Sequence, residues 1–267
     1  MSRAVERRGD DPAGTGRNRS RSASKRDAVS MSSRIEFSAT VLRESTHGEP
    51  TTATLVLGDD ELRVEGETDS FAVPSPDIFD VKLGSSPRAA AEFFPGTVLT
   101  VGFDRNDRRE VLFVDDDRST LRKYAGLCYR WLLDGSEVAV RHPAEVGGRV
   151  TGESFDIGTL RVTPGKVGCT NITHPFGVDL DMIVHLSRFE GELLGDRRTM
   201  IDLGYVRDGR AVSLDLSVDP PRTQHLLGRH LRQEYDDVRQ AVRTLDLPAP
   251  AVRLLYRLYS RRGSADP

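Results

Sequence analysis

The sequence of 267 residues contains only two cysteines, four lysines and one tryptophan. Two separate cysteines, Cys128 and Cys169, exclude a disulfide framework and favour a reduced, intracellular setting. No segment approaches the ~20 consecutive apolar residues of a membrane-spanning helix, so stable membrane insertion is not expected. These absences predict a cytoplasmic globular protein.

Motifs for catalysis, metals and cofactors are also missing. Gly152–Asp156 lacks the second glycine of a nucleophile elbow, and the chain has no Gly-x-x-x-x-Gly-Lys phosphate loop. Cys169, His174 and His185 do not have the paired spacing of a zinc site. We therefore expect a non-enzymatic protein with no catalytic residue, no metal and no cofactor.

Basic charge is concentrated at the N-terminus. The first 30 residues carry eight basic and four acidic residues, a net charge of +4, whereas the rest carries 30 basic and 37 acidic, a net charge of −7. An acidic body lacks the electrostatic surface of a nucleic-acid-binding domain, so nucleic acid is not an expected partner. Residues 1–33 are rich in Ser, Arg and Gly and predict a disordered leader.

What the chain does contain is an internal repeat. Leu62–Val64 matches Leu160–Val162 at a spacing of 98 residues, and Val101–Asn106 matches Leu203–Asp208 at a spacing of 102. Each copy has the same order of short strands, a tight hairpin and one amphipathic helix. A duplicated unit of this kind favours a binding or scaffolding protein over an enzyme, although fold alone does not settle function.

Alternating apolar residues predict the strands of both copies. Asn106–Asp107 and Asp208–Gly209 predict the tips of equivalent hairpins, and Gly102 and Gly204 within strands predict a bulge or a close helix contact. The strands are expected over residues 34–43, 51–57, 61–64, 71–73, 77–83, 97–103 and 109–114 in the first copy, and near 156–163, 166–171, 180–189, 200–205 and 211–218 in the second.

One helix follows the strands of each copy. Asp115–Asp117 offers an N-cap for a helix that ends near Asp134, and Trp131 is expected to be its largest buried side chain. Asp219 followed by two prolines starts a second, longer helix that reaches about Leu245. The predicted apolar stripes are Leu121, Tyr124, Ala125, Cys128, Trp131 and Leu132, and Leu227, Leu231, Tyr235, Val238, Val242 and Leu245.

The expected fold is mainly β with capping helices (α+β). It consists of two tandem β-sandwich or barrel domains, each closed by its C-terminal helix. The domains are expected at 34–135 and 148–246. A linker, 136–147, contains the breaker His142–Pro143 and ends at the breaker Gly147–Gly148.

Residues 247–263 predict a short terminal helix that is apolar on nearly every side. It either binds a partner through Leu254, Leu255, Leu258 and Tyr259, or packs back on the second domain. Arg105 and Arg207 recur at the two hairpin tips, where they could grip an acidic partner or could be ordinary exposed turn residues.

A seven-stranded unit closed by a helix and repeated in tandem resembles a pair of pleckstrin-homology-like (PH-like) domains. Together with the terminal phrase Leu254–Ser260, this order resembles the archaeal taxis protein family CheF, from Arg34 to about Arg262. The resemblance implies an adaptor. It would link the response regulator CheY and other Che proteins to the archaellum motor switch by protein–protein binding.

Two other functions remain open on the sequence. A lipid- or ligand-binding PH-like module would need a basic cluster at one end of the sheet, for which Arg105–Arg109 is the candidate. A transcription regulator would use the terminal segment as part of a winged helix, of which only one helix fits after Pro248.

Overall fold

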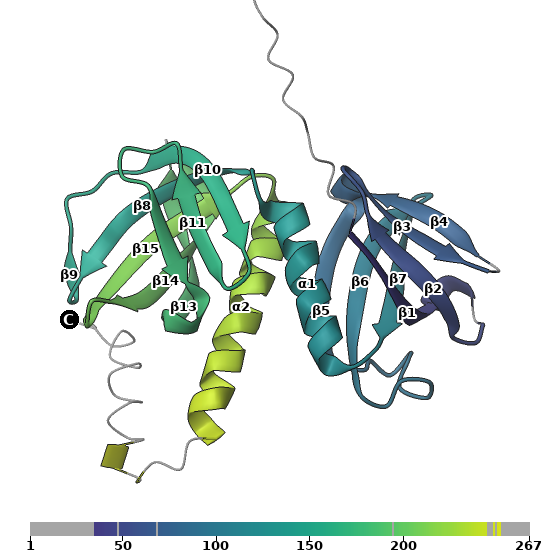
Figure 1. Cartoon of the computed structure of the whole chain (residues 1–267). Helices are drawn as coiled ribbons and strands as arrows, with labels where there is room; N and C mark the ends of the chain where they lie inside the picture. Colours follow the sequence, from purple (N-terminus) through teal and green to yellow (C-terminus); the bar gives the residue numbers. More distant parts are fainter. Residues whose placement is uncertain are drawn as a thin grey trace, which may run out of the picture. The chain divides into compact units, whose positions relative to one another are not determined.

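The computed structural model describes residues 35–46, 48–67, 69–193, 195–244, 248 and 250–251, all within one compact unit, Ser33–Pro267. The predicted leader lies outside these residues, as does most of the predicted terminal helix. The described chain is mainly β, with two antiparallel sheets and two long helices, as predicted (Figure 1). Within this part of the chain neither sheet closes into a barrel.

The first sheet contains all seven strands predicted for the first copy, in the order β4-β3-β2-β1-β7-β6-β5. β1 lies at its centre, because Ile35–Val41 pairs with β2 and Thr40–Arg43 pairs with β7. The elements are β1 Ile35–Arg43, η1 Glu44–Thr46, β2 Thr51–Leu57, β3 Glu61–Gly66, β4 Ser70–Pro74, η2 Ser75–Asp77, β5 Ile78–Ser85, β6 Thr97–Arg105 and β7 Arg108–Asp115.

The second sheet repeats this path as β12-β11-β10-β8-β15-β14-β13, with β9 paired to β8. The internal repeat is therefore a repeat of strand topology. The predicted match of Leu62–Val64 with Leu160–Val162 is wrong, however, because Leu62–Val64 lies in β3, whereas Leu160–Val162 lies in β10, which takes the position of β2. The sequence patterns missed β8, β9 and β12. The elements are β8 Glu137–Val146, β9 Arg149–Val150, β10 Asp156–Thr163, β11 Lys166–Thr170, β12 Phe176–Asp179, η3 Leu180–Met182, β13 Ile183–Leu193, β14 Asp196–Arg207 and β15 Arg210–Val218.

The predicted linker 136–147 is wrong, because these residues form the central strand β8. Pro143 cannot donate a ladder hydrogen bond, but the register of β8 on β15 shifts between the pairs Ser213–Glu145 and Asp215–Arg141. Pro143 thus lies at an irregularity, where a proline is tolerated within a sheet. The strands of the second copy consequently begin at Glu137.

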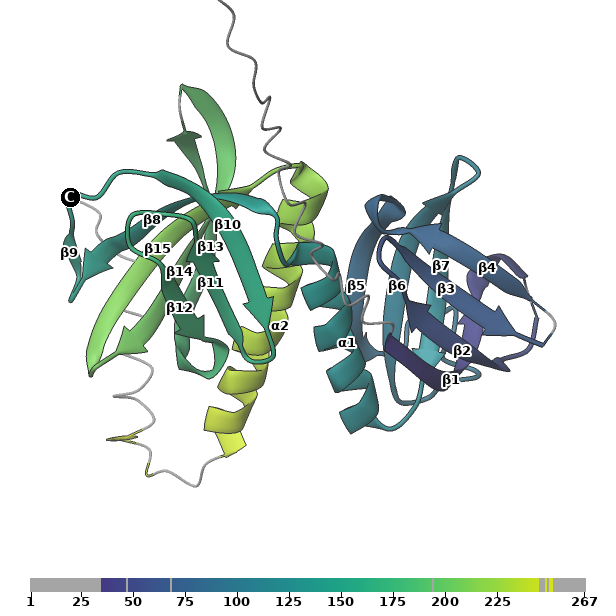
Figure 2. The ribbon, with the colours of Figure 1, turned by 45° about the horizontal axis from the view of Figure 1, so that its top comes forward.

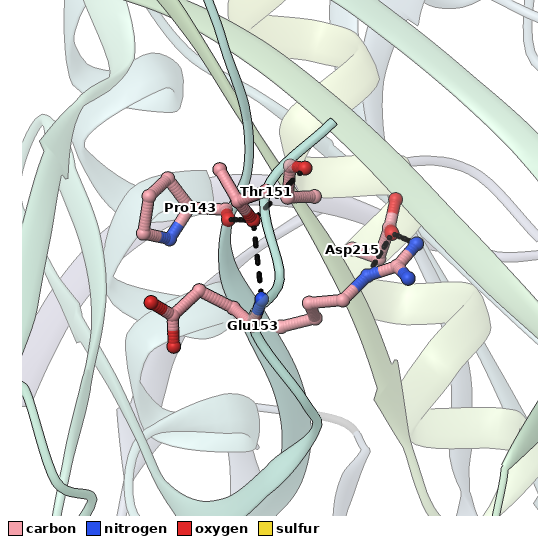
Figure 3. A network of polar contacts seen from close by, with 6 residues as sticks. Pro143, Thr151, Glu153 and Asp215 are labelled. Atoms are coloured by element: carbon pink, nitrogen blue, oxygen red, sulfur yellow. Dashed lines mark hydrogen bonds and ion pairs between the residues drawn. The ribbon is translucent and has the colours of Figure 1, made fainter. Parts of the chain in front are cut away.

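Side chains compensate the irregular part of β8 (Figure 3). The Thr151 hydroxyl donates to the carbonyl oxygens of Pro143 and Ala144. Arg141 Nε donates to Asp215 Oδ2 at 3.0 Å, and the Asp215 side chain is only 7 % exposed. The buried polar groups near the bulge therefore have partners, as a stable sheet interior requires.

Both predicted hairpins have the expected geometry. Asn106 and Asp107 have φ of 51° and 59°, and Asp208 and Gly209 have φ of 51° and 70°. Positive φ at both central residues is characteristic of a type I′ turn, whose twist matches that of the flanking strands.

Gly102 lies at a bulge, which was one of the two roles predicted for it, the other being a close contact with a helix. It pairs with Asp80, immediately after the register of β5 on β6 shifts past Ile78. A Cβ at Gly102 would lie 2.7 Å from the ring of Phe79, so a larger residue would displace that ring. Gly204 pairs with His185 at the equivalent shift in the second sheet.

The two helices are α1, Arg118–Leu133, and α2, Pro221–Thr244. Asp117 is the N-cap of α1, since its Oδ1 accepts from the backbone N–H groups of Ser119 at 2.9 Å and Thr120 at 3.1 Å. Hydrogen bonds from the hydroxyls and N–H groups of these two residues hold the pKa of the Asp117 carboxyl well below its usual range. The predicted cap is confirmed.

Each helix packs on its own sheet, as predicted, and also on the other. α1 contacts β5 and β6 and reaches β10, whereas α2 contacts β13 and β15 and also β5. The two helices lie side by side in both views (Figures 1 and 2). One continuous apolar core contains residues of both sheets and both helices, so the helices form a wall that the two sheets share.

The prediction that Trp131 is the main buried side chain of α1 is wrong. Tyr129 is fully buried, its hydroxyl donates to the carbonyl of Val81 in β5, and its ring stacks on His230 of α2 at 4.7 Å. Trp131 is only partly buried at the edge of the core. The predicted stripe assumed one contact surface for α1, but α2 provides a second, which buries the neighbouring positions.

Two tyrosines of α1 provide a matched test of this contact. Tyr129→Phe should lower the free energy of unfolding by about 1–2 kcal/mol, because the buried Val81 carbonyl loses its donor. The Tyr124 hydroxyl is buried without a hydrogen-bond partner among the described residues, so Tyr124→Phe should be neutral or stabilising. Urea unfolding followed by circular dichroism measures both; equal effects would contradict the assigned hydrogen bond.

His230 makes stability depend on pH. Burial lowers its pKa to about 4 from about 6.5, so between these values the unfolded chain binds more protons than the folded one. The free energy of unfolding should therefore fall as the pH drops from 7 to 4.5, by roughly 2–3 kcal/mol from this residue. In His230→Phe, which keeps an aromatic ring against Tyr129, the fall measured by urea unfolding should be about 2 kcal/mol smaller; an unchanged fall contradicts the assignment.

Candidate functional site

Four of the six residues predicted to bind a partner, Leu254, Leu255, Leu258 and Tyr259, lie outside the described residues. The other two, Arg105 and Arg207, end the equivalent strands β6 and β14. They belong to different sheets, and no contact between them occurs in the described part of the chain. The structure therefore presents them as two separate candidate sites.

Strand register aligns the two sites residue by residue. Ile78 follows η2 and pairs with Phe103, and Ile183 follows η3 and pairs with Tyr205. Arg105 and Arg207 each lie two residues beyond that aromatic residue. The two sites can thus be compared position by position.

The site in the first sheet is closed around Phe71 of β4. Arg43 lies over this ring at 4.9 Å and Arg105 lies over it at 5.1 Å, while Phe103 stacks on it at 5.8 Å. Phe71 is only 8 % exposed. Cation–π contacts on an aromatic ring stabilise this arrangement. The Arg105 side chain therefore packs on Phe71 and does not project freely from the hairpin tip.

In the second sheet His142 takes the position of Arg43, and Phe176 takes that of Phe71. The His142 ring stacks on Phe176 at 3.8 Å, and its Nε2 is 2.7 Å from the Tyr205 hydroxyl. Burial lowers the pKa of His142 to about 4, and the Arg207 guanidinium adds to the effect. A neutral imidazole at physiological pH leaves Arg207 as the cation of this site.

A pocket of about 300 Å³ opens beside this cluster. Met182 is 48 % exposed and Val206 is 37 % exposed, although both are apolar. The Arg207 side chain is 59 % exposed, and its Nε lies 3.9 Å from Asp208. The lining residues are Pro175, Phe176, Gly177, Asp179, Met182, Tyr205, Val206 and Arg207. We call this set the aromatic pocket; it offers apolar contact area with a cation at its rim.

The exposed apolar residues distinguish the two copies. Met182 ends η3 where Asp77 ends η2, and Val206 stands where Asp104 stands in β6. In the first copy Asp104 is paired, accepting from Arg222 Nη2 at 2.7 Å. Because the same fold carries aspartates at both positions, the fold does not require apolar residues there.

Sequence reasoning selected Arg207 but missed Met182, Val206, His142 and Phe176. The repeat contained a signal for Met182 and Val206, because alignment of the two copies sets these apolar residues against Asp77 and Asp104 of the first copy. The missed strand β12 hid it, since Phe176 lies in that strand.

Within the described residues no group of three or more His, Cys, Asp or Glu side chains could hold a metal ion. The helices of this part of the chain include none that is long and apolar enough to cross a membrane.

Comparison with known proteins gives matches of different strength. Taxis protein CheF2 of Halobacterium salinarum is 26 % identical over 221 residues, which cover 83 % of this chain and 76 % of the relative. A solved structure titled "Structure of the Spt16D Pob3N heterodimer" covers 69 % of this chain and 96 % of that chain, at 9 % identity and a TM-score of 0.27. A TM-score this low supports no structural argument.

A family model matches most of the chain. It is described as archaeal chemotaxis signal transduction system protein F and aligns with residues 37–237, about three quarters of the sequence. The match runs through both sheets and into α2. This chain therefore belongs to the CheF family of archaeal chemotaxis signal transduction proteins.

Proposed function

We propose that the protein is a non-enzymatic adaptor that links the response regulator CheY and other Che proteins to the archaellum motor switch. Family membership makes it a chemotaxis signalling protein. The observation that carries the finer proposal is a difference between the two copies: the exposed residues Met182 and Val206 line the aromatic pocket of the second copy, where the first copy has Asp77 and Asp104.

An adaptor must bind two proteins and needs no catalytic site to do so. The first copy has seven strands and the second has eight, and a helix follows the strands of each, an order that we assign to tandem PH-like domains. One copy ends in a closed, charged cluster around Phe71, whereas the other ends in the aromatic pocket. Two dissimilar ends on a repeated scaffold suit two different partners.

Binding at the aromatic pocket would bury Met182 and Val206 and place an acidic group of the partner against Arg207. Aromatic and arginine side chains dominate the binding energy of protein interfaces when they are desolvated. Phosphorylation of the response regulator would change its binding free energy for this protein, by about 1–3 kcal/mol for a typical coupled equilibrium.

Observed contacts favour the adaptor over a lipid-binding module. Two arginines of the basic cluster Arg105–Arg109 lie over aromatic rings of the protein, Arg105 over Phe71 and Arg109, whose side chain is 83 % exposed, over Phe79 at 5.2 Å. A headgroup would have to displace these contacts. The acidic balance of the body also opposes binding to an anionic membrane.

The aromatic pocket can be tested by giving it the residues of the first copy. Met182→Asp combined with Val206→Asp should weaken binding of CheY or of the archaellum switch at least tenfold in calorimetric titrations. Both side chains are exposed, so the fold should persist in circular dichroism. Val150→Asp is the matched control, since Val150 is 73 % exposed on β9, away from the pocket. Unchanged affinity for both partners would remove the pocket from the proposal.

The terminal segment is tested separately. A chain that ends at Leu247 keeps every strand and both long helices of the described residues, so it should fold, as checked by circular dichroism. It should lose the regulator or the switch component in a pull-down if Leu254, Leu255, Leu258 and Tyr259 form a contact. Retention of both partners at wild-type levels would assign binding to the described part of the chain alone.

A further inference from the structure

A second pocket, of about 270 Å³, lies between β13 and α2. Four of its lining residues are basic, namely Arg188 on β13 and His225, Arg229 and Arg232 on α2, and none is acidic. We call it the basic pocket. Like charges that lie close together repel one another unless anions compensate them. The acidic partner of each basic residue therefore decides how much positive charge remains in the pocket.

Asp80 of β5 compensates part of the charge. Arg229 donates to both of its carboxylate oxygens, with Nε–Oδ1 and Nη2–Oδ2 distances of 3.1 Å each, and His225 Nε2 lies 3.6 Å from Oδ1. A bidentate contact of this kind fixes the guanidinium and balances one charge. Arg229 is therefore held in place at the wall of the pocket.

The other two arginines have no acidic partner among the described residues. Arg232 makes only a long contact of 3.5 Å from Nη2 to the carbonyl oxygen of Leu186, and its guanidinium lies 5.7 Å from the Tyr235 ring. The Arg188 side chain makes no hydrogen bond or ion pair in the described part of the chain. Two guanidinium groups thus remain uncompensated, with their donors available.

Gly228 brings Arg188 against the helix. A Cβ at this position would collide with the Arg188 guanidinium, so only glycine lets that group lie on the backbone of α2. Arg229 and Arg232 belong to the same part of the helix. The pocket is consequently lined by arginines from two elements, and not by a row along one exposed face.

The first copy shows that the fold does not need these cations. Strand register places Val81 where Leu186 stands and Leu83 where Arg188 stands. The Val81 carbonyl accepts from the Tyr129 hydroxyl, whereas the Leu186 carbonyl faces Arg232. Leu83 and Tyr129 occupy the contact between strand and helix in the first copy. Arg188 and Arg232 occupy the equivalent contact in the second copy, where the basic pocket lies.

We propose that the basic pocket binds a compact divalent oxyanion, a phosphate group or its analogue sulfate. Guanidinium forks match the oxygens of such anions in geometry and charge. The volume of about 270 Å³ is large enough to admit such an anion. This site is distinct from the aromatic pocket and does not depend on the taxis function.

Titration of the full-length protein with inorganic phosphate tests the proposal. Ionic strength is held constant with sodium chloride, so that screening does not change. Calorimetry should show saturable binding by the wild type. Arg188→Gln and Arg232→Gln should each weaken it about tenfold, which corresponds to the loss of one charge-assisted contact of about 1.4 kcal/mol. Gly228→Ala should act in the same direction, because it displaces Arg188.

Arg149→Gln is the matched control, since Arg149 is an exposed arginine on β9; it should bind phosphate as the wild type does. If Arg188→Gln fails to fold, Arg188→Lys keeps the charge but loses the fork, and should bind more weakly than the wild type. Adenosine monophosphate distinguishes the sources, because equal or tighter binding indicates a phosphate ester and weaker binding indicates the free ion. No saturable binding, or wild-type affinity in both arginine variants, would overturn the proposal.

Discussion

The packing of α2 against two sheets at once is the constraint on which the rest of the structure depends. Leu227 and Leu231, four residues apart, are fully buried in the shared core. Arg222 and Arg229, seven residues apart on another face, bind Asp104 and Asp80 of the first sheet. The helical period makes this division possible, because residues four and seven apart fall on common faces.

A third face of α2 meets α1, where Arg122 lies 3.5 Å from Glu234. Since one helix satisfies apolar and polar partners on three sides, it cannot move away from one sheet while keeping its contacts with the other. The two copies are therefore joined by structure as well as by sequence. A protein that binds either copy acts on a wall that both share.

Duplication also separates what the fold needs from what it merely tolerates. Both copies keep the bulge glycine, the type I′ hairpin and the turn before the fifth strand, so these features are structural. They differ where Arg43 becomes His142 and where Leu83 becomes Arg188. Residues that differ between two copies of one fold are not required by that fold, and both candidate pockets lie at such residues.

Much of the fold could be predicted from local chemistry. The N-cap Asp117, the hairpin residues Asp208 and Gly209, and the diproline start of α2 each act within a few residues, so the sequence pattern is sufficient. Strand β8 was missed because His142–Pro143 indicates a break, and only the register shift on β15 makes a proline acceptable there. That compensation comes from a strand about 70 residues away, which no local pattern contains.

The candidate sites were harder to predict for the same reason. Arg207 was selected from the sequence, but exposure decides whether an arginine is free, and Arg105 at the matching position packs on Phe71. Tyr129 was missed because its burial depends on α2, whose position relative to α1 is a tertiary property. Long-range contacts, not propensities, determine these details.

The wall of helices also concentrates the polar groups that burial leaves without partners. Within the described residues, the Tyr124 hydroxyl, the Trp131 indole N–H and both ring nitrogens of His230 are buried and make no hydrogen bond. Each such group costs about 1–3 kcal/mol relative to a satisfied one. A sheet interior made of paired strands carries no comparable cost, because its backbone groups bond to one another.

His230 places one of these costs at the contact between α1 and α2, where its ring stacks on Tyr129. Because α2 packs on β5 of the first sheet and on β13 of the second, any shift of α2 relative to α1 would reach both sheets.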